Sequence, residues 1–557
     1  MRTSILRVAI FALLTCLCFT AASQTAPTWN WVQQIGGTGF EYTFSTVADA
    51  SGNIYQTGSF NSSMQVGNTV LTSAPADMYL VKYNRQGVLQ WAQQGHVQNA
   101  NGQARAEGGN IATDAAGNVY VSGVLIGTVT FGSIVVTAPS GTPSTFVVKF
   151  TSQGTAVWGV ASSGTGTGNR TDSSGLAVNA NGEVFVSGAY KATIAFGNLS
   201  ATSQGDYDAF LMKLNAAGVP QWLRSAGGTG VDYASALTVA PGNGVYLSGS
   251  LSAVATFGSL VAISRGGLDA FLMQYDGQGT PQWLQTFGGS GDDGSGTVVT
   301  VPSGELYTVG YFQSTADFGT STLISQGGKD GFVVKCTAQG VPLWAKAMGG
   351  SGNDSAFGAS WGAAGVLYVS GTFTNTASFS GQSITSVGGK DIFAAQYDAA
   401  GNVSWVESCG GPIDDESGGI AAGTNGTVFL GGYFRGTVQF GPLTLASRGS
   451  YDSFIVQLQD NTVTGLRNAA KNDDYRVYPN PLAQGAALVL AVPGTGHAPG
   501  SIDIIDLTGK VVHHQIEKPG DIAGNQILIG QLALAPGIYL LKYSTADLSV
   551  FKRIQVQ

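Results

Sequence analysis

Residues 264 to 283 read SRGGLDAFLMQYDGQGTPQW, and related stretches recur along most of the chain. The tryptophan that ends this stretch has counterparts 61 residues apart, and so have an aspartate inside it and a glycine upstream of it. These positions are Trp222, Trp283, Trp344 and Trp405; Asp208, Asp269, Asp330, Asp391 and Asp452; and Gly188, Gly249, Gly310, Gly371 and Gly432. Looser copies nearer the N-terminus bring the number of units to seven. Self-similarity at a long fixed period is typical of repeat architectures.

Apolar and polar residues alternate within one unit, which is the pattern of β-strands with two different faces. In residues 235 to 283 the strand candidates are ALTVA, VYLSGSL, DAFLMQY and TPQWLQTF, with PGNG and DGQG as turns. Seven units of four strands predict an all-β fold, a seven-bladed β-propeller. The long period excludes helical repeats and the much shorter coils of a parallel β-helix.

The last unit lacks its fourth strand. After residues 452 to 459, DSFIVQLQ, the chain turns polar, whereas residues 27 to 37, PTWNWVQQIGG, carry the pattern of the missing tryptophan strand. We therefore predict a propeller over residues 24–460, in which strand 27–37 pairs as the outer strand of the last blade. Such a strand joins the two ends of the ring.

The repeated blocks identify a family resemblance. Together with the opening stretch, GNVYVSG at 117 to 123, FG at 257 to 258 and GGSGDD at 288 to 293 resemble the bacterial SBBP-type β-propeller repeat. The resemblance covers roughly residues 27 to 460. The second unit departs from it, with QGHVQNANGQARAEGG at 94 to 109, and Thr145 stands where the other units have aspartate.

The motif Gly-Gly-x-Gly-x-Asp, at 227 to 232, 288 to 293 and 349 to 354, raises the question of calcium. A calcium-binding β-helix needs this motif in tandem every nine residues, but here it recurs every 61. We therefore interpret the glycines as allowing positive φ and close backbone approach, and the aspartate as a turn cap. The sequence predicts no cofactor and no metal site on this interpretation.

A ligand-binding interpretation of the same motif stays open. Its acidic residues would form a ring on the loop-rich face of the propeller, where carboxylates bind a cation such as calcium or sugar hydroxyls. The ring residues are Glu41, Asp172, Asp232, Asp293, Asp354 and Asp415. The second aspartate series and the repeated tryptophans are interpreted as turn and packing residues.

Catalytic signals are weak. His96 is the only propeller histidine, and no nucleophile elbow, phosphate loop or dinucleotide fingerprint occurs. Cys336 and Cys409 occupy different places in their units, which favours separate apolar fillers over a pair. A formal net charge of −8 and a pI near 5.0 argue against a nucleic-acid partner. Carboxylates that break the repeat are the candidates for an enzyme: Glu107, Asp414, Asp415 and Glu416.

The two ends of the chain predict its export. Residues 1–23 have two arginines, an apolar run and small residues before the predicted cleavage point, as in a secretory signal peptide. No other apolar run approaches the roughly 20 residues of a membrane-spanning helix. Residues 461–474 are polar and predict a linker, and the short strands of 475–557 predict a small immunoglobulin-like β-sandwich.

This C-terminal module resembles the type A C-terminal sorting domain of type IX secretion. The matching residues are Tyr478, Pro479, Asn480, Pro481, Asp506, Gly509, Lys510, Gly537, Tyr539, Lys542, Phe551 and Lys552. The resemblance implies the type IX secretion machinery as a partner, passage through the periplasm and outer membrane, and a secreted or outer cell-surface location. It also implies removal of the tail, which we expect in the exposed segment 461–477.

These observations predict an exported binding or adhesion module for extracellular polysaccharide or protein. An enzyme is the less favoured reading; the alternative is a propeller hydrolase or lyase that acts on polysaccharide. A structural surface coat is the third hypothesis. Exposed aromatic residues would favour a binder, whereas carboxylates that break the repeat and converge at the centre would favour an enzyme.

Overall fold

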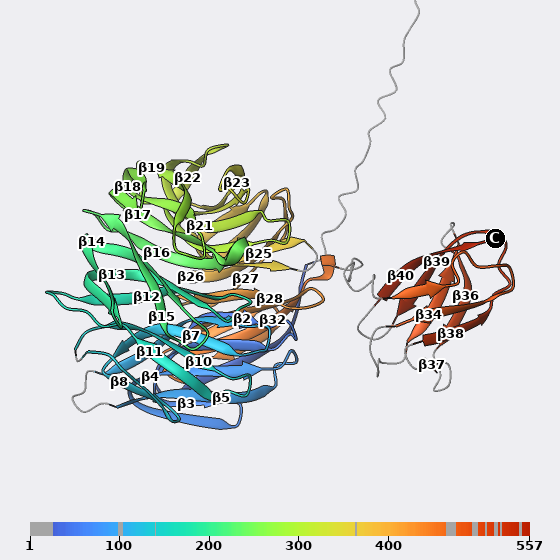
Figure 1. The fold of residues 1–557 in the computed structure, drawn as a ribbon, viewed down its shortest axis with the longest axis horizontal. Helices are drawn as coiled ribbons and strands as arrows, with labels where there is room; N and C mark the ends of the chain where they lie inside the picture. The colour runs from blue at the N-terminus through green and yellow to red at the C-terminus, as the bar shows by residue number, and fades with distance from the viewer. Residues whose placement is uncertain are drawn as a thin grey trace, which may run out of the picture.

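The computed structural model describes residues 26–98, 104–139, 141–362, 365–463, 475–492, 500–506, 510–516, 522–523, 526–544 and 549–557. The described chain is built from β-strands, with only two short 3-10 turns, at Pro241–Asn243 and Asn461–Val463 (Figure 1). The prediction of an all-β protein is therefore confirmed. Within these ranges no helix is long and apolar enough to cross a membrane. The predicted signal peptide and residues 464–474 of the predicted linker lie outside the described residues.

The larger body, coloured blue to orange in Figure 1, consists of seven antiparallel units that follow the sequence repeat. The first strands of the units are β2(Glu41–Ala48), β6(Arg105–Thr113), β12(Arg170–Val178), β16(Tyr233–Val239), β20(Gly294–Thr300), β24(Ser355–Gly362) and β28(Glu416–Ala422). The second strands are β3(Ile54–Val66), β7(Val119–Ile126), β13(Val184–Phe196), β17(Val245–Phe257), β21(Leu306–Asp317), β25(Val366–Phe379) and β29(Thr427–Phe434). Each first strand pairs with the second strand of its unit.

Third and fourth strands complete each unit. The third strands are β4(Thr69–Tyr83), β10(Ser144–Phe150), β14(Leu199–Leu214), β18(Leu260–Tyr275), β22(Thr322–Cys336), β26(Gln382–Tyr397) and β32(Asp452–Gln459). The fourth strands are β5(Leu89–Gln98), β11(Ala156–Ala161), β15(Pro220–Gly228), β19(Pro281–Gly289), β23(Pro342–Gly350), β27(Val403–Gly410) and, for the last unit, β1(Thr28–Gly37). Two units add separate hairpins, β8(Thr128–Phe131) with β9(Ile134–Thr137), and β30(Thr437–Phe440) with β31(Leu443–Ala446).

The N-terminal strand β1 links the last unit to the first. It pairs antiparallel with β32, where Val32 faces Val456, and its last residues pair with β3, where Ile35 faces Val66. Inside the chain, the end of β15 crosses in the same way to β17 of the next unit at Gly227 and Gly228. The pairing expected between residues 27–37 and the last repeat is therefore present.

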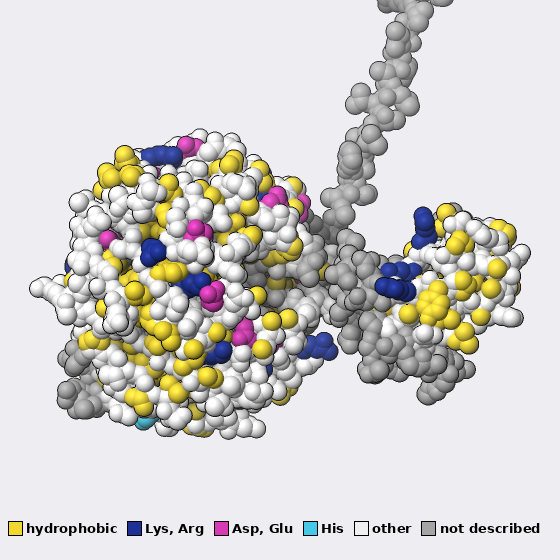
Figure 2. Space-filling view, in the orientation of Figure 1, with side chains coloured by type: hydrophobic (Ala, Val, Ile, Leu, Met, Phe, Trp, Pro, Cys, Tyr) yellow, Lys and Arg dark blue, Asp and Glu magenta, His cyan; other side chains and the backbone are white. Residues whose placement is uncertain are grey.

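The first strands also follow one another in a closed order. Contacts join β2 to β6, β6 to β12, β12 to β16, β16 to β20, β20 to β24, β24 to β28, and β28 back to β2. Acidic and basic side chains are interspersed over the surface of this body (Figure 2).

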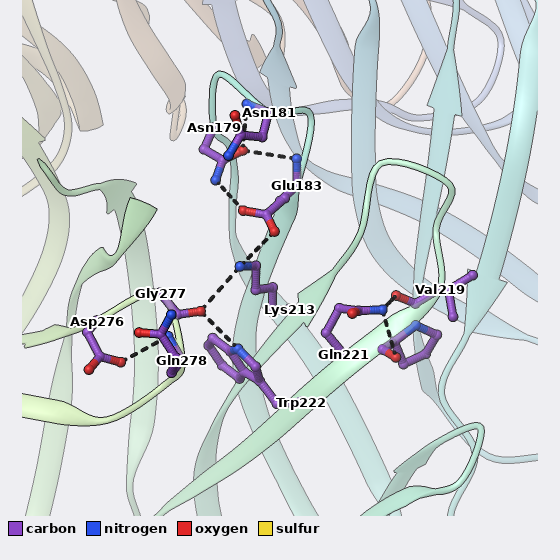
Figure 3. A network of polar contacts seen from close by, with 11 residues as sticks. Asn179, Asn181, Glu183, Lys213, Val219, Gln221, Trp222, Asp276, Gly277 and Gln278 are labelled. Atoms are coloured by element: carbon purple, nitrogen blue, oxygen red, sulfur yellow. Dashed lines mark hydrogen bonds and ion pairs between the residues drawn. The ribbon is translucent and has the colours of Figure 1, made fainter. Parts of the chain in front are cut away.

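Tryptophans of the fourth strands pack between neighbouring units. The Trp222 ring lies against Gly279 in the next unit, and its indole nitrogen donates to Gly277 O at 3.2 Å. Lys213 donates to the same carbonyl at 3.2 Å and pairs with Glu183 Oε1 at 2.8 Å (Figure 3). Trp158 and Trp344 make equivalent indole bonds to the next unit. These tryptophans therefore join units and are not exposed platforms for sugars.

Two four-stranded antiparallel sheets form the C-terminal module. One has the order β33(Arg476–Tyr478), β34(Ala487–Ala491), β38(Gln526–Gln531), β37(Ile522–Ala523); the other has β36(Val511–Ile516), β35(Ser501–Ile505), β39(Gly537–Ser544), β40(Ser549–Val556). Side chains from both sheets, including Leu490, Ile504, Ile527 and Leu541, are fully buried in one core. Alternation along each strand directs these residues inward.

Candidate ligand-binding cavity and carboxylate positions

A cavity of about 900 Å³ is lined by residues of all seven first strands. A register shift in β2 sets Phe44 outside the regular pairing, and a shift in β24 does the same for Phe357. Such bulges redirect a side chain. Phe44 is 41% exposed and Phe357 is 44% exposed, and both line the cavity. The cavity wall therefore carries exposed aromatic rings.

The rim of this cavity is defined here by one register position in each first strand. At this position each residue faces the one that follows the repeated glycine of the second strand. The rim residues are Tyr42, Glu107, Asp172, Tyr233, Gly294, Ser355 and Glu416. Of these, Asp172 and Tyr233 line the cavity. Their types differ from unit to unit, although the surrounding frame repeats.

Basic side chains accompany the three acidic rim residues. Arg170 Nε lies 2.7 Å from Asp172 Oδ2, and Arg105 Nε lies 3.3 Å from Glu107 Oε1. Hydrogen bonding to Asp172 is the main cause of a raised pKa of Arg170, to which the charge of Glu107 also contributes. The two ion pairs of neighbouring units are therefore close enough to act on one another.

Aromatic and further charged residues extend the rim. The Tyr207 and Tyr233 rings are 5.7 Å apart, and Tyr233 is 36% exposed. Lys191 lies 5.7 Å from the Tyr207 centroid and forms an ion pair with Asp206. Sequence reasoning missed Tyr42 and Tyr233. The signal that could have found them is the variable position directly after the acidic residue of the Gly-Gly motif.

The predicted open ring of six carboxylates needs correction at Asp172. Its register places Thr171, rather than Asp172, at the position that Glu41 occupies in β2. Asp172 is consequently a partly exposed rim residue, while Thr171 is buried and bonds to the Ser162 hydroxyl at 2.9 Å. Residues 163–169 before β12 differ in length and composition from the Gly-Gly connection of the other units. The sequence alignment of this unit with the others was therefore wrong by one residue.

The other five ring residues are buried, with at most 1% of each exposed. Asp232 accepts hydrogen bonds from Gly228 N at 2.9 Å and Ser252 N at 3.2 Å. Glu41, Asp293, Asp354 and Asp415 each accept the corresponding bond from the amide of the residue four positions earlier. They close the connection between units and do not face solvent as a ring, as the turn interpretation of the motif expects.

The main role of the motif glycines is to leave space for neighbouring carboxyl groups and backbone, and only some of them adopt a positive φ. A Cβ on Gly227 would lie 2.7 Å from Asp208 Cγ and 2.9 Å from Asp232 Oδ2. A Cβ on Gly228 would lie 1.9 Å from Val254 O, where the chain crosses to the next unit. Among the described glycines of this motif, positive φ occurs at Gly288 (154°) and Gly349 (145°).

Each of these five carboxylates lies near an aspartate of the second series, which is also buried. Asp208, for example, accepts a bond from Gln204 N at 3.2 Å, in agreement with a turn role. Burial, partly opposed by backbone donors, raises the pKa of Asp232 and of Asp293 to about 6, and that of Asp415 to about 7. Burial and then the charge of Asp452 raise the pKa of Glu41 to about 8.

Two junctions between units lack such a pair. Between the first and second units Asp77 accepts a bond from Val97 N at 3.0 Å and lies 3.3 Å from His96, whose side chain is 67% exposed. Between the second and third units Thr145 N donates to the hydroxyls of Ser162 and Thr171 at 2.9 and 2.7 Å. The departures noted in the sequence therefore fall at the junctions.

The remaining candidates have structural surroundings. Cys336 and Cys409 are buried, free thiols. Asp414 accepts a bond from Lys390 N at 2.9 Å, and Glu416 pairs with Lys390 Nζ at 2.5 Å. Across the described ranges no group of three or more His, Cys, Asp or Glu side chains could hold a metal ion.

The predicted sorting residue Asn480 holds the terminal strand β40, and Asp506 closes the turn between β35 and β36. Asn480 Nδ2 donates to Arg553 O at 2.8 Å, and Gln555 N donates to Asn480 Oδ1 at 2.9 Å. Asp506 accepts a bond from Lys510 N at 3.1 Å. Gly509 lies outside the described residues, as does the side chain of Phe551.

Comparisons with known proteins identify the C-terminal module. The model of the family "Secretion system C-terminal sorting domain" matches residues 476–557. No curated protein matches the chain. A solved fungal alcohol oxidase of the AA5 family, in complex with copper, has 13% identity and a TM-score of 0.40, with 96% of this chain and 100% of that chain covered. PorZ, a surface component of the type IX secretion system of Porphyromonas gingivalis, has 10% identity and a TM-score of 0.26, with 95% and 100% covered.

The family match supports the sequence resemblance of the tail directly. Residues 476–557 are a type IX secretion C-terminal sorting domain, and the protein is exported by that system to the cell surface or beyond.

Proposed function

We propose that residues 26–463 form a seven-bladed β-propeller of SBBP-type units that binds an extracellular polysaccharide at its cavity rim. The closed order of the seven first strands supports the propeller, and so does the pairing of β1 with β32. Export by the sorting domain requires the ligand to lie outside the cell or on its surface.

The exposed aromatic rings of the cavity wall, together with the variable rim, carry the binding proposal. Phe44, Tyr233 and Phe357 offer exposed rings on the cavity wall. Aromatic faces combine a large apolar surface with low entropy loss, and they suit the apolar faces of sugar rings. The neighbouring Arg170 and Asp172 supply charge-assisted hydrogen bonds for hydroxyl groups. A concave site with apolar walls and few polar groups is the usual form of a ligand site.

A glycan array tests this proposal with the exported, purified protein. We expect binding to a restricted set of polysaccharides, and a loss of at least about tenfold in affinity on Tyr233→Ala or Phe357→Ala, about 1.4 kcal/mol each. Ile263→Ala is the matched control, because Ile263 is 65% exposed but does not line the cavity. If Tyr233→Ala and Phe357→Ala bind as tightly as the control Ile263→Ala, the cavity is not the binding site.

The enzyme alternative rests on Glu107 and Asp172. These carboxylates break the repeat and occupy equivalent rim positions in adjacent units. Glycoside hydrolysis requires two carboxyl groups on either side of the scissile bond. Under this hypothesis Glu107→Gln or Asp172→Asn abolishes release of oligosaccharides while binding persists, whereas a pure binder releases none in the wild type.

A further inference from the structure

Five junctions between units each contain a pair of buried carboxyl groups. We name these the junction pairs: Asp208–Asp232, Asp269–Asp293, Asp330–Asp354, Asp391–Asp415 and Asp452–Glu41. All ten residues are at most 1% exposed. The binding and enzyme proposals use none of them.

In three of the pairs both members approach the same glycine, which is Gly227, Gly288 or Gly349. A Cβ built on Gly349 would lie 2.8 Å from Asp330 Cγ and 2.8 Å from Asp354 Oδ2, so both carboxyl groups face one side of this Cα. Two charged carboxylates at such a buried site repel one another and lose their hydration. One of the two charges must therefore be neutralised in the folded protein.

The hydrogen bonds of the two partners differ. Asp354 accepts Gly350 N at 2.8 Å and Thr374 N at 3.0 Å, one on each oxygen, as suits an ionised carboxylate. Asp330 accepts Gln326 N at 3.1 Å on Oδ2, while its buried Oδ1 has no partner. Asp208 and Asp269 each have one such oxygen, in the Asp391–Asp415 pair both members have one, and in the remaining pair it belongs to Glu41. An unpartnered oxygen beside an ionised carboxylate is the expected place of a proton.

A cation is the competing neutraliser. Calcium takes six to eight oxygen ligands, often from several carboxylates. In the described ranges no third acidic, histidine or cysteine side chain joins a pair to form a metal site. The hydrogen-bond pattern therefore favours a proton.

We propose that each junction pair holds one proton between its two carboxyl groups in acid, so that the pairs stabilise the ring there and this stabilisation is lost as pH rises to neutrality. Burial raises the pKa of Asp330 and of Asp391 to about 6, and raises the pKa of Glu41 to about 8. A carboxyl group with a raised folded-state pKa contributes stability at low pH, and this contribution is lost as pH rises through the folded value. The contribution therefore falls from the unfolded carboxyl value of about 4 up to about pH 6 for Asp330 and Asp391, and up to about pH 8 for Glu41.

Other ionisable groups face four of the pairs and modify their titration. They are Tyr79 and Arg448 at Asp452–Glu41, Tyr190 at Asp208–Asp232, Arg265, Asp292 and Tyr311 at Asp269–Asp293, and Glu407, Cys409 and Asp414 at Asp391–Asp415. At Asp330–Asp354 the shifts arise from burial, backbone donors and the partner carboxyl group. Lys329, the preceding residue, lies 3.9 Å from the Tyr311 ring centroid. Asp330–Asp354 is thus the cleanest pair to test.

The test uses Asp330→Asn in the full exported protein, because the amide N–H can replace the shared proton as a donor to Asp354. Melting temperature is measured from pH 5 to pH 9 with chelator, and again with calcium. We expect the wild-type melting temperature to fall from pH 5 and to level off by about pH 8, and the variant to melt above the wild type at pH 8 but not at pH 5. The infrared band of un-ionised carboxyl groups should shrink between pH 5 and pH 8, and at pH 5 it should be smaller in the variant by the contribution of one carboxyl group.

Asp398→Asn is the matched control. Hydrogen bonds from Asn402 and Ala400 outweigh burial and lower the pKa of this turn carboxylate. Its loss should lower the melting temperature equally at pH 5 and pH 8 and leave the infrared band unchanged. A wild-type band that does not change with pH would overturn the proposal, and so would a calcium-dependent rise in melting temperature that Asp330→Asn removes.

Discussion

The N-terminal strand should contribute strongly to stability, and Trp29→Ala tests this role. Trp29 lies at the start of β1, far in sequence from the unit that it completes, and only 8% of it is exposed. Its ring lies 6.1 Å from the Phe440 ring, and it shares a core with Val456 of β32. A Cβ on Gly441 would lie 2.4 Å from its Cδ1, so the last unit is shaped around this indole.

The size of the effect follows from the buried indole. Truncating a buried tryptophan or phenylalanine to alanine costs about 3–5 kcal/mol. With a urea m-value of about 3 kcal/mol/M or more for a chain of this size, the unfolding midpoint should move by about 1 M. Because β1 also pairs with β3 of the first unit, the loss should affect the whole ring and not the last unit alone.

Urea unfolding monitored by the remaining tryptophans measures this effect. Val88→Ala is the control, because Val88 lies in an exposed turn and is 57% exposed, and such surface changes stay within about 0.5 kcal/mol. A midpoint shift for Trp29→Ala no larger than that of the control would refute the argument that β1 closes the ring.

Three further outcomes are expected. Gly288→Ala places a Cβ 2.6 Å from a buried carboxyl carbon and should cost at least about 1–3 kcal/mol in urea unfolding; a smaller loss than for Gly109→Ala, whose Cβ would meet nothing closer than 3.6 Å, would contradict the space-making role. Deleting residues 475–557 should leave folded protein in the periplasm, as cell fractionation would show, and truncated protein in the medium would count against the sorting role. Lys213→Met should cost about 1.5–3 kcal/mol at pH 7. Burial opposes ionisation of Glu183, but its bond from Lys213 helps to lower its pKa, so the difference between Lys213→Met and wild type should shrink as pH falls below the carboxyl range.

The 61-residue period of the sequence predicted most of the strand arrangement, because the residues that repeat are those that tight packing restricts. Trp222 fills a junction in which only a glycine leaves room for the ring, and Gly228 lies where two backbones cross. Such positions tolerate few residue types, so they repeat visibly. The role of residues 27–37 followed from the same logic, since a unit without its tryptophan strand leaves an edge unpaired.

The site was predicted less well, because burial and register are properties of the packed chain. Asp232 looks like a surface ligand in sequence, and only the space over Gly227 shows that it points inward beside Asp208. Asp172 was assigned to the wrong position because the connection before β12 departs from the motif. Glu107 was recognised, since it breaks the repeat, although its place on the rim required the register of β6.

Each junction pair contains one residue that is followed directly in the chain by a rim residue. Residues that stabilise the fold and residues that could recognise a ligand are therefore distinct. Successive residues of a strand point to opposite faces. Because Asp232 is buried at the junction, the next residue, Tyr233, points toward the cavity, and the same step relates Glu41 to Tyr42. The buried position is held by backbone donors on both sides, whereas rim residues contact side chains that differ from unit to unit, such as Arg170 beside Asp172 and Tyr207 beside Tyr233. Rim residues can therefore differ from unit to unit without disturbing the frame, which is why the variable residues, and not the repeated ones, are where specificity for a ligand should be sought.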